Sequence, residues 1–390
     1  MKEPKIRFKG FSGEWKDLPF SEIAERTSSI GKAGSLPGIE FEDIVSGEGC
    51  LNKDVYQKDC RKYGKIFREG DILFGKLRPY LRNILLAEFR GIAIGDFWIL
   101  RPGDNDCKFI YNLVNSEAFM RVANVSSGSK MPRADWNLVS STMFLLPQDK
   151  VEQEVIGKYF TSLDAQISAS TSRLASLKQV KAACLQAMFP QEGETVPKIR
   201  FKGFEGEWKK VKFGILLKEC TDKSTSEDED ILLSSAINGV FLNSELFGHQ
   251  RGRSNIGYRK VRRNMLILSA QNLHLGNANV NLRFEHGLVS PAYKIYDLYN
   301  VLPEFMYHWI KREETKKFFL DATTAGASLC RKNIVWTDLY KQNILLPKSD
   351  TEQQSIASFF TSLDRQIALH TQRLEKLKQI KAACLDKMFV

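Results

Sequence analysis

Two stretches of the chain place apolar residues alternately four and three positions apart. A 4-3 spacing kept over more than four heptads is typical of a coiled-coil seam, so each stretch predicts a helix about 57 Å long at roughly 1.5 Å per residue. The seam of residues 151–190 holds Ile156, Phe160, Leu163, Ile167, Leu174 and Leu177, and that of residues 351–390 holds Ile356, Phe360, Leu363, Ile367, Leu374 and Leu377.

The two helical stretches are repeats of each other. Residues 160–189 and 360–389 align without a gap and are about two-thirds identical. Residues 5–16, KIRFKGFSGEWK, return as residues 198–209, KIRFKGFEGEWK, with one change. The segments between these repeats share no register, so a scaffold is duplicated around two unlike middles. Such a chain is suited to recognising something with two unlike halves.

The repeats predict a fold with internal pseudo-two-fold symmetry. Each helix must bury its apolar stripe, and antiparallel pairing with the other helix fits best. Lys181 and Lys381 occupy matching seam positions, where a polar residue fixes register. We predict two α/β domains in tandem, separated by two long helices in an antiparallel coiled coil. The expected segments are a head (1–16), the first α/β domain (17–150), the first helix (151–190), a linker and repeated head (191–209), the second α/β domain (210–350) and the second helix (351–390).

Both middles mix short apolar runs with helical patterns, which is the basis for the α/β prediction. Each ends with a loop of small and basic residues, then Trp136 or Trp336, and then an apolar run that closes on LLP. The runs that predict strands are residues 71–74, 96–100, 264–270 and 293–296, and those that predict helices are residues 108–122 and 303–320.

Charge and composition narrow the class of partner. The 390 residues carry a net charge of +11, which favours an anionic partner, and no basic amphipathic anchor points to a membrane surface. No apolar run approaches the roughly 20 residues of a membrane span, and the charged amino terminus lacks a signal-peptide core, so we expect a cytoplasmic protein. The seven cysteines include no C-x-x-C pair, which argues against a disulfide framework or a zinc ribbon.

Basic and small polar residues in the two middles are candidates for DNA contact. Lysine and arginine bind phosphates or guanine edges, asparagine and glutamine read adenine, and small residues allow close approach of the backbone. A solvated surface is the alternative for each cluster taken singly. The candidates are Lys76, Arg78, Arg82, Ser129, Lys130 and Arg133 in the first middle, and Arg251, Arg253, Arg259, Gln271, Asn272, Arg331 and Lys332 in the second.

No catalytic motif is complete. GDILFGKL at residues 70–77 nearly matches a phosphate-binding loop, but Leu77 stands where the magnesium-binding hydroxyl belongs. EWK in each head resembles a nuclease fragment, yet the first head lacks an upstream aspartate to complete a metal site. The five histidines have no metal-binding spacing, and neither a glycine-rich methyl-donor loop nor an adenine-methylation motif is present. We therefore predict no catalytic residue, metal or cofactor in this chain.

The repeated head, the GDILFGKLRPYL stretch, the W…LLP closure and FTSLD leading each helix together resemble specificity subunits of type I restriction-modification systems. The resemblance spans the chain, although the second middle has RNMLILSAQNLHLGN in place of GDILFGKLRPYL. It implies that each α/β domain reads one half of a bipartite, asymmetric double-stranded DNA site while the helices set the gap. It also implies two methyltransferase subunits that use S-adenosylmethionine, and two restriction subunits that use ATP and magnesium.

Two other classes stay open at this point. A stand-alone nuclease or NTPase could use GDILFGKL and EWK, and a coiled-coil adaptor would need no nucleic acid.

Overall fold

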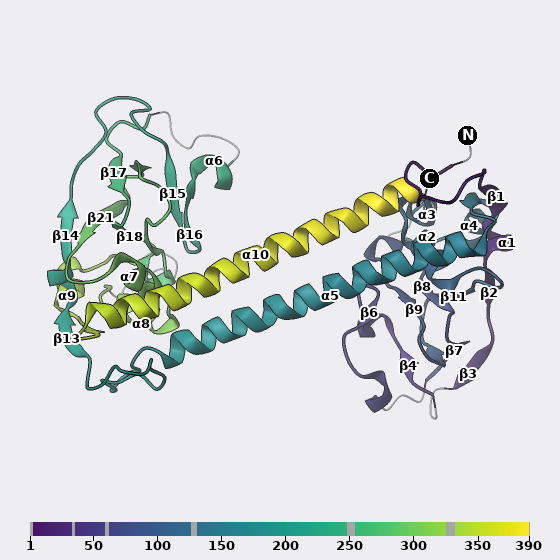
Figure 1. Ribbon diagram of the computed structural model, residues 1–390, viewed down its shortest axis with the longest axis horizontal. Helices are drawn as coiled ribbons and strands as arrows, with labels where there is room; N and C mark the ends of the chain where they lie inside the picture. The colour runs from purple at the N-terminus through teal and green to yellow at the C-terminus, as the bar shows by residue number, and fades with distance from the viewer. Residues whose placement is uncertain are drawn as a thin grey trace. The chain divides into compact units, whose positions relative to one another are not determined.

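The computed structural model describes residues 3–32, 36–58, 62–125, 131–247, 254–324 and 332–389. The chain divides into two compact units: unit 1 is Met1–Ser172 with Thr371–Val390, and unit 2 is Arg173–His370. Each unit contains one α/β domain and a part of both long helices, α5 (Lys150–Ala187) and α10 (Asp350–Met388) (Figure 1). Within the described ranges, no helix combines the length and the apolar character needed to cross a membrane.

The α/β domain of unit 1 contains two four-stranded sheets, ordered β2-β11-β8-β9 and β3-β7-β10-β4, in which β10–β4 is the parallel pair and the other pairs are antiparallel. Its strands are β1 (Lys16–Pro19), β2 (Glu25–Thr27), β3 (Ile30–Lys32), β4 (Gly38–Ile39), β5 (Ile44–Val45), β6 (Cys50–Leu51), β7 (Tyr63–Phe67), β8 (Ile72–Gly75), β9 (Ile84–Leu86), β10 (Gly91–Ala93), β11 (Phe97–Arg101) and β12 (Met143–Leu146). Its helices are α1 (Phe20–Ile23), α2 (Cys107–Asn115), α3 (Glu117–Ala123) and α4 (Trp136–Ser141), with 3-10 turns η1 (Phe41–Asp43), η2 (Val55–Gln57) and η3 (Pro79–Leu81).

The α/β domain of unit 2 contains one four-stranded antiparallel sheet, ordered β14-β21-β18-β19, and three two-stranded ribbons, β13–β22, β15–β16 and β17–β20. Its strands are β13 (Lys209–Lys212), β14 (Leu217–Cys220), β15 (Leu233–Ala236), β16 (Gly239–Leu242), β17 (Arg259–Arg262), β18 (Leu266–Ser269), β19 (Ala278–Val280), β20 (His286–Val289), β21 (Tyr293–Leu298) and β22 (Asn343–Leu346). Its helices are α6 (Asn243–Leu246), α7 (Pro303–Ile310), α8 (Glu313–Leu320) and α9 (Trp336–Lys341), with 3-10 turns η4 (Phe213–Leu216) and η5 (Leu273–Leu275).

The four predicted strands are confirmed as β8, β11, β18 and β21. Each helical stretch predicted within the middles, residues 108–122 and 303–320, proves to be two helices. In unit 1 the break falls at Ser116, whose hydroxyl accepts from the Phe119 N–H at 3.3 Å and so caps the start of α3. In unit 2 the break falls at Lys311 and Arg312, between α7 and α8.

The two α/β domains share a backbone plan that the sequence does not reveal. The central strand β8 or β18 is followed by a 3-10 turn, η3 or η5, and then by the edge strand β9 or β19. Gly70 and Asn264, just before the central strands, both have positive φ (82° and 70°), as do Arg82 and Gly276 just after the 3-10 turns (51° and 92°). A left-handed conformation at corresponding places marks the same turns, although the residue types differ.

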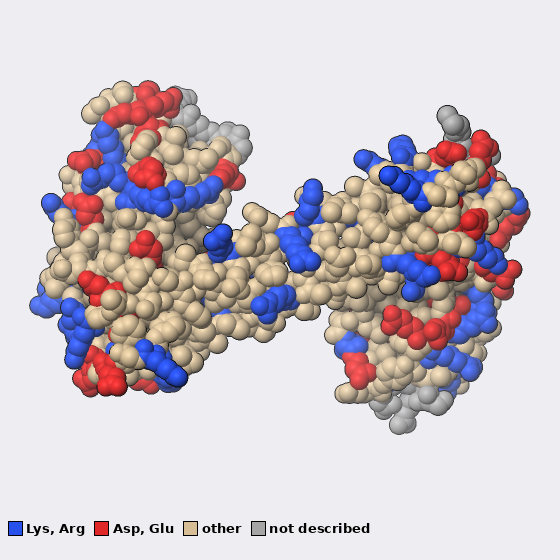
Figure 2. All heavy atoms as spheres, viewed as in Figure 1, with Lys and Arg blue, Asp and Glu red and all other residues tan. Residues whose placement is uncertain are grey.

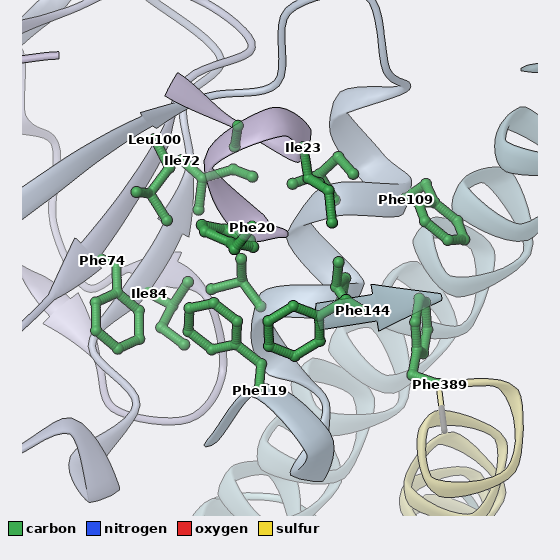
Figure 3. Packing of buried hydrophobic residues seen from close by; sticks show 14 of the residues in the cluster. Phe20, Ile23, Ile72, Phe74, Ile84, Leu100, Phe109, Phe119, Phe144 and Phe389 are labelled. Carbon is green, nitrogen blue, oxygen red and sulfur yellow. The ribbon is translucent and has the colours of Figure 1, made fainter. Parts of the chain in front are cut away.

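The core of unit 1 joins the sheet, the helices and the end of α10. Phe20, Phe119 and Phe144 pack together between the strands and helices, and Phe389 reaches Phe109 with ring centroids 5.2 Å apart (Figure 3). Residues at the end of the described chain therefore complete the domain that begins it.

In unit 2 the end of α5 has the corresponding role. Phe189 stacks on Phe360 of α10 at 6.1 Å and contacts Phe305 of α7 at 5.4 Å, and all three rings are fully buried.

Each head segment anchors the start of a long helix. Arg7 donates two hydrogen bonds to the buried Glu152 carboxylate, at 2.7 and 2.8 Å, and the indole N–H of Trp15 donates a third at 3.4 Å. In unit 2 Arg200 and Trp208 hold Glu352 in the same way, at 2.7, 2.8 and 3.2 Å. The tryptophan of the repeated EWK thus serves to fix a helix.

Inside each unit the two long helices run antiparallel. In unit 1 the Asp164 carboxylate pairs with Lys381 at 2.6 Å, and Tyr159, earlier in α5, contacts Cys384, later in α10, at 3.5 Å. In unit 2 Lys181 pairs with Asp364 at 2.5 Å. All twelve seam residues predicted from the sequence are buried or half-buried.

Candidate nucleic-acid interface

The loop that follows β8 in unit 1 is fixed at its backbone to two other segments. The Lys76 N–H donates to the Asp96 carbonyl at 2.9 Å, and the Lys76 carbonyl accepts from the Ala134 N–H at 2.9 Å. The Arg78 N–H donates to the Pro132 carbonyl at 2.8 Å. Arg78 has a left-handed backbone (φ 50°) that is uncommon for arginine, and these bonds help to hold it there.

Asp96 draws two of the candidate cations together. Its carboxylate lies 3.4 Å from the Lys76 ammonium and accepts from the Arg133 guanidinium at 3.0 Å. Burial alone would raise the pKa of Asp96, but Arg133 and Lys76 together hold that pKa below its ordinary value. Because the carboxylate stays ionised, the two cations are held in place rather than free to swing in solvent.

Lys65 of β7 adjoins this cluster. Its ammonium donates to the carbonyl of Phe97, the residue after Asp96. Burial, reinforced by the positive charges of Lys76 and Arg26, lowers the pKa of Lys65. We define Lys65, Lys76, Asp96 and Arg133 as the basic cluster of unit 1.

The other candidates of the first middle have separate positions. Arg82 bonds the Asn115 carbonyl at 2.6 Å and the Glu117 carboxylate, so it ties the loop to α2 and α3. The Arg78 side chain is exposed and has no ion-pair partner among the described residues. Ser129 and Lys130 lie outside the described residues.

The candidates of the second middle that can be placed lie on different elements. Arg259 is on β17, half-buried, with a hydrogen bond of 3.3 Å to the Thr221 carbonyl. Gln271 and Asn272 follow β18, and both backbone N–H groups donate to the Ser269 hydroxyl, at 3.4 and 3.2 Å. Lys332 precedes α9 and is half-buried. Arg251, Arg253 and Arg331 lie outside the described residues.

Four charged residues at or near the placed candidates were not among the candidates from the sequence: Lys65, Asp96, Arg26 and Lys294. Asp96 is a single carboxylate before a strand, and nothing in its neighbourhood signals a bridging role. Arg26 of β2 lies 4.6 Å from the centroid of the Trp136 ring, and in unit 2 Lys294 of β21 lies 4.7 Å from Trp336. The loop tryptophan in each W…LLP closure was the available signal, because its face attracts a cation.

Charge is distributed differently over the two α/β domains. On the face seen in Figure 2, unit 2 carries a band of Lys and Arg below an acidic group, whereas on unit 1 the two signs are interspersed. On this face, basic side chains therefore gather into a distinct region on unit 2 but not on unit 1.

The GDILFGKL motif does not fold as a phosphate-binding loop. GDILFGKL forms β8 and the approach to the 3-10 turn η3, in place of the strand, loop and helix that bind a phosphate. Lys76, the lysine of this motif, faces Asp96. Across the described segments, no three His, Cys, Asp or Glu side chains are grouped closely enough to hold a metal ion.

Comparison with known proteins agrees with this picture. Residues 291–379, which run from β21 into α10, match the family model of the type I restriction modification DNA specificity domain. This match confirms the resemblance to type I restriction-modification specificity subunits that the sequence motifs indicate.

Two solved structures show a similar fold over nearly the whole chain. One is the S subunit of a type I restriction-modification system from M. genitalium, with a TM-score of 0.60, 14% identity, and 100% of this chain and 99% of that chain covered. The other belongs to a structure described as the basis of complex assembly and conformational transition of the type I R-M system, with a TM-score of 0.52, 18% identity, and 96% and 97% covered. Among curated protein sequences none matches the chain.

Proposed function

We propose that this protein is the DNA sequence-specificity subunit of a type I restriction-modification complex. The match of residues 291–379 to a DNA specificity domain carries the proposal. In unit 1 and unit 2, unlike α/β domains are attached to the same helix anchors, so each domain is suited to read one half of a bipartite, asymmetric DNA site. In unit 1 the basic cluster and Arg78 supply phosphate and base-edge contacts. In unit 2 Gln271 and Asn272 take the positions that correspond to Leu77 and Arg78.

We further propose that α5 and α10 form an antiparallel coiled-coil spacer that sets the gap between the two half-sites. The buried stripes support this role, as do the ion pairs Asp164–Lys381 and Lys181–Asp364, in which the same two sequence positions exchange partners. Because each lysine sits at a seam position, a slip of the register would leave a charge against apolar residues.

The proposed partners are double-stranded DNA, two methyltransferase subunits and two restriction subunits. On this proposal the chain itself is not catalytic. Methyl transfer from S-adenosylmethionine and cleavage driven by ATP and magnesium belong to the partner subunits. The similar fold found in a structure of type I complex assembly supports an assembly role.

The direct test is methylation of DNA by the chain together with a type I methyltransferase subunit. Sequencing that detects modified adenines should reveal one motif in two defined parts with a fixed gap. Methylation that is absent or uniform would overturn the proposal. The isolated chain incubated with duplex DNA, ATP and magnesium should show no cleavage, with Lys76→Ala as the comparison that would expose a stand-alone nuclease or NTPase.

A further inference from the structure

The β3–β7 pair forms one edge of the sheet β3-β7-β10-β4 in unit 1. Strand β10 pairs with β7 only from Lys65 to Phe67, so the outer part of the pair, at Tyr63 and Gly64, extends past β10 as a two-stranded ribbon with two very different faces. Ile30 lies opposite Lys65 and Lys32 lies opposite Tyr63, so these four side chains share one face. Gly31 and Gly64 lie opposite each other on the other face.

The glycine face is covered by neighbouring residues of the same sheet, from β7 and β10. A Cβ atom at Gly64 would lie 2.3 Å from the Ala93 carbonyl, and one at Gly31 would lie 2.8 Å from the Ile66 side chain. The two glycines therefore leave room for the side chains of Ile66 and Ile92 over this face, whereas the larger side chains of the pair stand on the opposite face.

The outward face exposes two large apolar side chains. Ile30 is 74% exposed and Tyr63 is 68% exposed. Single exposed apolar residues are ordinary, but here an aliphatic and an aromatic side chain share one small surface with a lysine. The Lys32 ammonium lies 5.8 Å from the centroid of the Tyr63 ring, so a positive charge borders the apolar pair.

The same face leads into the basic cluster. Lys65, opposite Ile30, reaches the Phe97 carbonyl beside Asp96, where Lys76 and Arg133 are held. Glu40, a nearby carboxylate, is neutralised by Lys58 and Lys62 at 2.5 and 2.6 Å. The apolar pair is thus flanked by cations whose acidic neighbours are already paired, and this charge complements a polyanion rather than a protein surface of mixed charge.

We propose that the β3–β7 ribbon lies in the major groove of the half-site bound by unit 1, with Ile30 and Tyr63 against base edges and Lys32 near a phosphate. This inference rests on the proposed function and names the element and residues that read the bases. The major groove of DNA is wide enough for a two-stranded ribbon, and apolar side chains there recognise the methyl group of thymine. Such contacts distinguish base pairs, whereas lysine contacts to phosphate do not.

The test uses the full chain with its methyltransferase partner. Adenine methylation is mapped for the wild type, for Tyr63→Ala, for Ile30→Ser and for the double variant. Tyr56→Ala is the matched control, because Tyr56 is a tyrosine of unit 1 with a similar exposed fraction of 67%. Tyr63→Phe keeps the apolar ring and should behave like the wild type. Thermal unfolding of each variant checks that these surface changes leave the fold intact.

The double variant should relax the base preference at one or two positions in one half of the motif and leave the other half unchanged. Binding to the wild-type motif should weaken roughly tenfold or more, within the range that single base-pair mismatches cost. Replacing thymine by deoxyuridine in that half-site should weaken wild-type binding but not binding of the double variant.

A wild-type motif in two parts that persists unchanged in the double variant, with equal affinity, would overturn the ribbon's role while leaving the proposed function standing. Loss of methylation with DNA binding unchanged would also overturn it, because the face would then contact the methyltransferase. A wild type that yields no two-part motif would overturn the proposed function and this inference together.

Discussion

The loops that follow β8 and β18 have the same backbone course and different chemistry. The unit 1 loop carries Lys76, Arg78 and Arg82, whereas the corresponding places in unit 2 are occupied by Ala270, Asn272 and Gly276. Where Arg82 adopts a left-handed backbone and bonds the α2–α3 junction, Gly276 adopts the same conformation without a side chain. The two loops thus form the same turn through the same left-handed backbone conformation, although their side chains differ.

The residues that anchor the long helices, in contrast, have the same side chains in both units. Arg7, Trp15 and Glu152 are matched by Arg200, Trp208 and Glu352 with nearly equal distances. Side chains in the two units are therefore the same where they hold the helices and different in the loops for which we propose DNA contact.

The largest expected effect comes from the anchors. Glu152→Ala and Glu352→Ala should each lower the free energy of unfolding by about 3–5 kcal/mol, because each removes the buried carboxylate that pairs with an arginine and accepts from a tryptophan. Chemical denaturation followed by tryptophan fluorescence measures the loss. Glu154→Ala is the control, since the exposed Glu154–Lys158 pair, 3.0 Å apart, should contribute no more than about 1 kcal/mol. Clearly unequal losses of unfolding free energy for the two variants would show that the two anchors do not contribute equally to stability.

The second prediction concerns one buried position that differs between the units. His308 in α7 is 1% exposed and takes the place that Asn112 has in α2. Its ring lies 3.4 Å from the Thr361 hydroxyl and 4.0 Å from the Asp364 carboxylate. Burial, and then the charge of Lys181, lower the pKa of His308 to about 3.

The lowered pKa of His308 makes the folded protein less stable at acidic pH. Below about pH 6.5 the unfolded chain protonates His308 while the folded chain does not, so stability falls as pH drops from 6.5 towards 3. At 1.36 kcal/mol for each pKa unit, the loss between pH 7 and pH 5 is about 2 kcal/mol. Urea denaturation of the wild type and of His308→Asn at both pH values measures it. An equal pH dependence in the two proteins would contradict the assignment.

The third prediction compares the two loops directly. Arg78→Ala should weaken DNA binding roughly tenfold and reduce the slope of log affinity against log salt by about 1, because a phosphate contact is lost. Asn272→Ala should relax base preference in the other half-site and leave the salt slope unchanged. Titration of the complex with duplexes that carry each half-site measures both effects. Identical behaviour of the two variants would show that the loops do not differ in what they contact.

The smallest expected effect comes from the ion pairs of the helices. Their side chains are 20–35% exposed, so each pair should contribute about 0.2–1 kcal/mol. A double-mutant cycle with Lys381→Ala and Asp164→Ala measures the pairing energy, and the cycle with Lys181 and Asp364 should give the same value. A coupling energy of zero in both cycles would leave the apolar seam alone to set the register.

The sequence predicted those parts of the fold that depend on repeated or periodic residues. Both long helices and the strands β8, β11, β18 and β21 could be predicted, because spacing and identity are visible in a single chain. The shared plan of the two middles could not be predicted, since it depends on backbone conformation at Gly70, Asn264 and Gly276 and not on matching side chains.

The site was predicted only in part for a related reason. Lys76 and Arg133 were candidates because cations near small residues suggest DNA contact, and the structure brings these two together. Asp96, which holds them, is distant in sequence from Arg133 and belongs to no motif. A tertiary contact made by a single aspartate leaves no recognisable pattern in the sequence.

The division of the two long helices between the units has a consequence for the order of folding during synthesis. Unit 2 is one continuous stretch, Arg173–His370, whereas unit 1 also needs Thr371–Val390. On the ribosome the last contributors to the unit 1 core, Met388 and Phe389, emerge after all of unit 2. Domains usually fold in the order of synthesis, with the amino-terminal domain first. In this chain the core of unit 2 can be completed before the core of unit 1. A nonsense codon or proteolytic cut near residue 371 will damage the domain encoded first and spare the one encoded second.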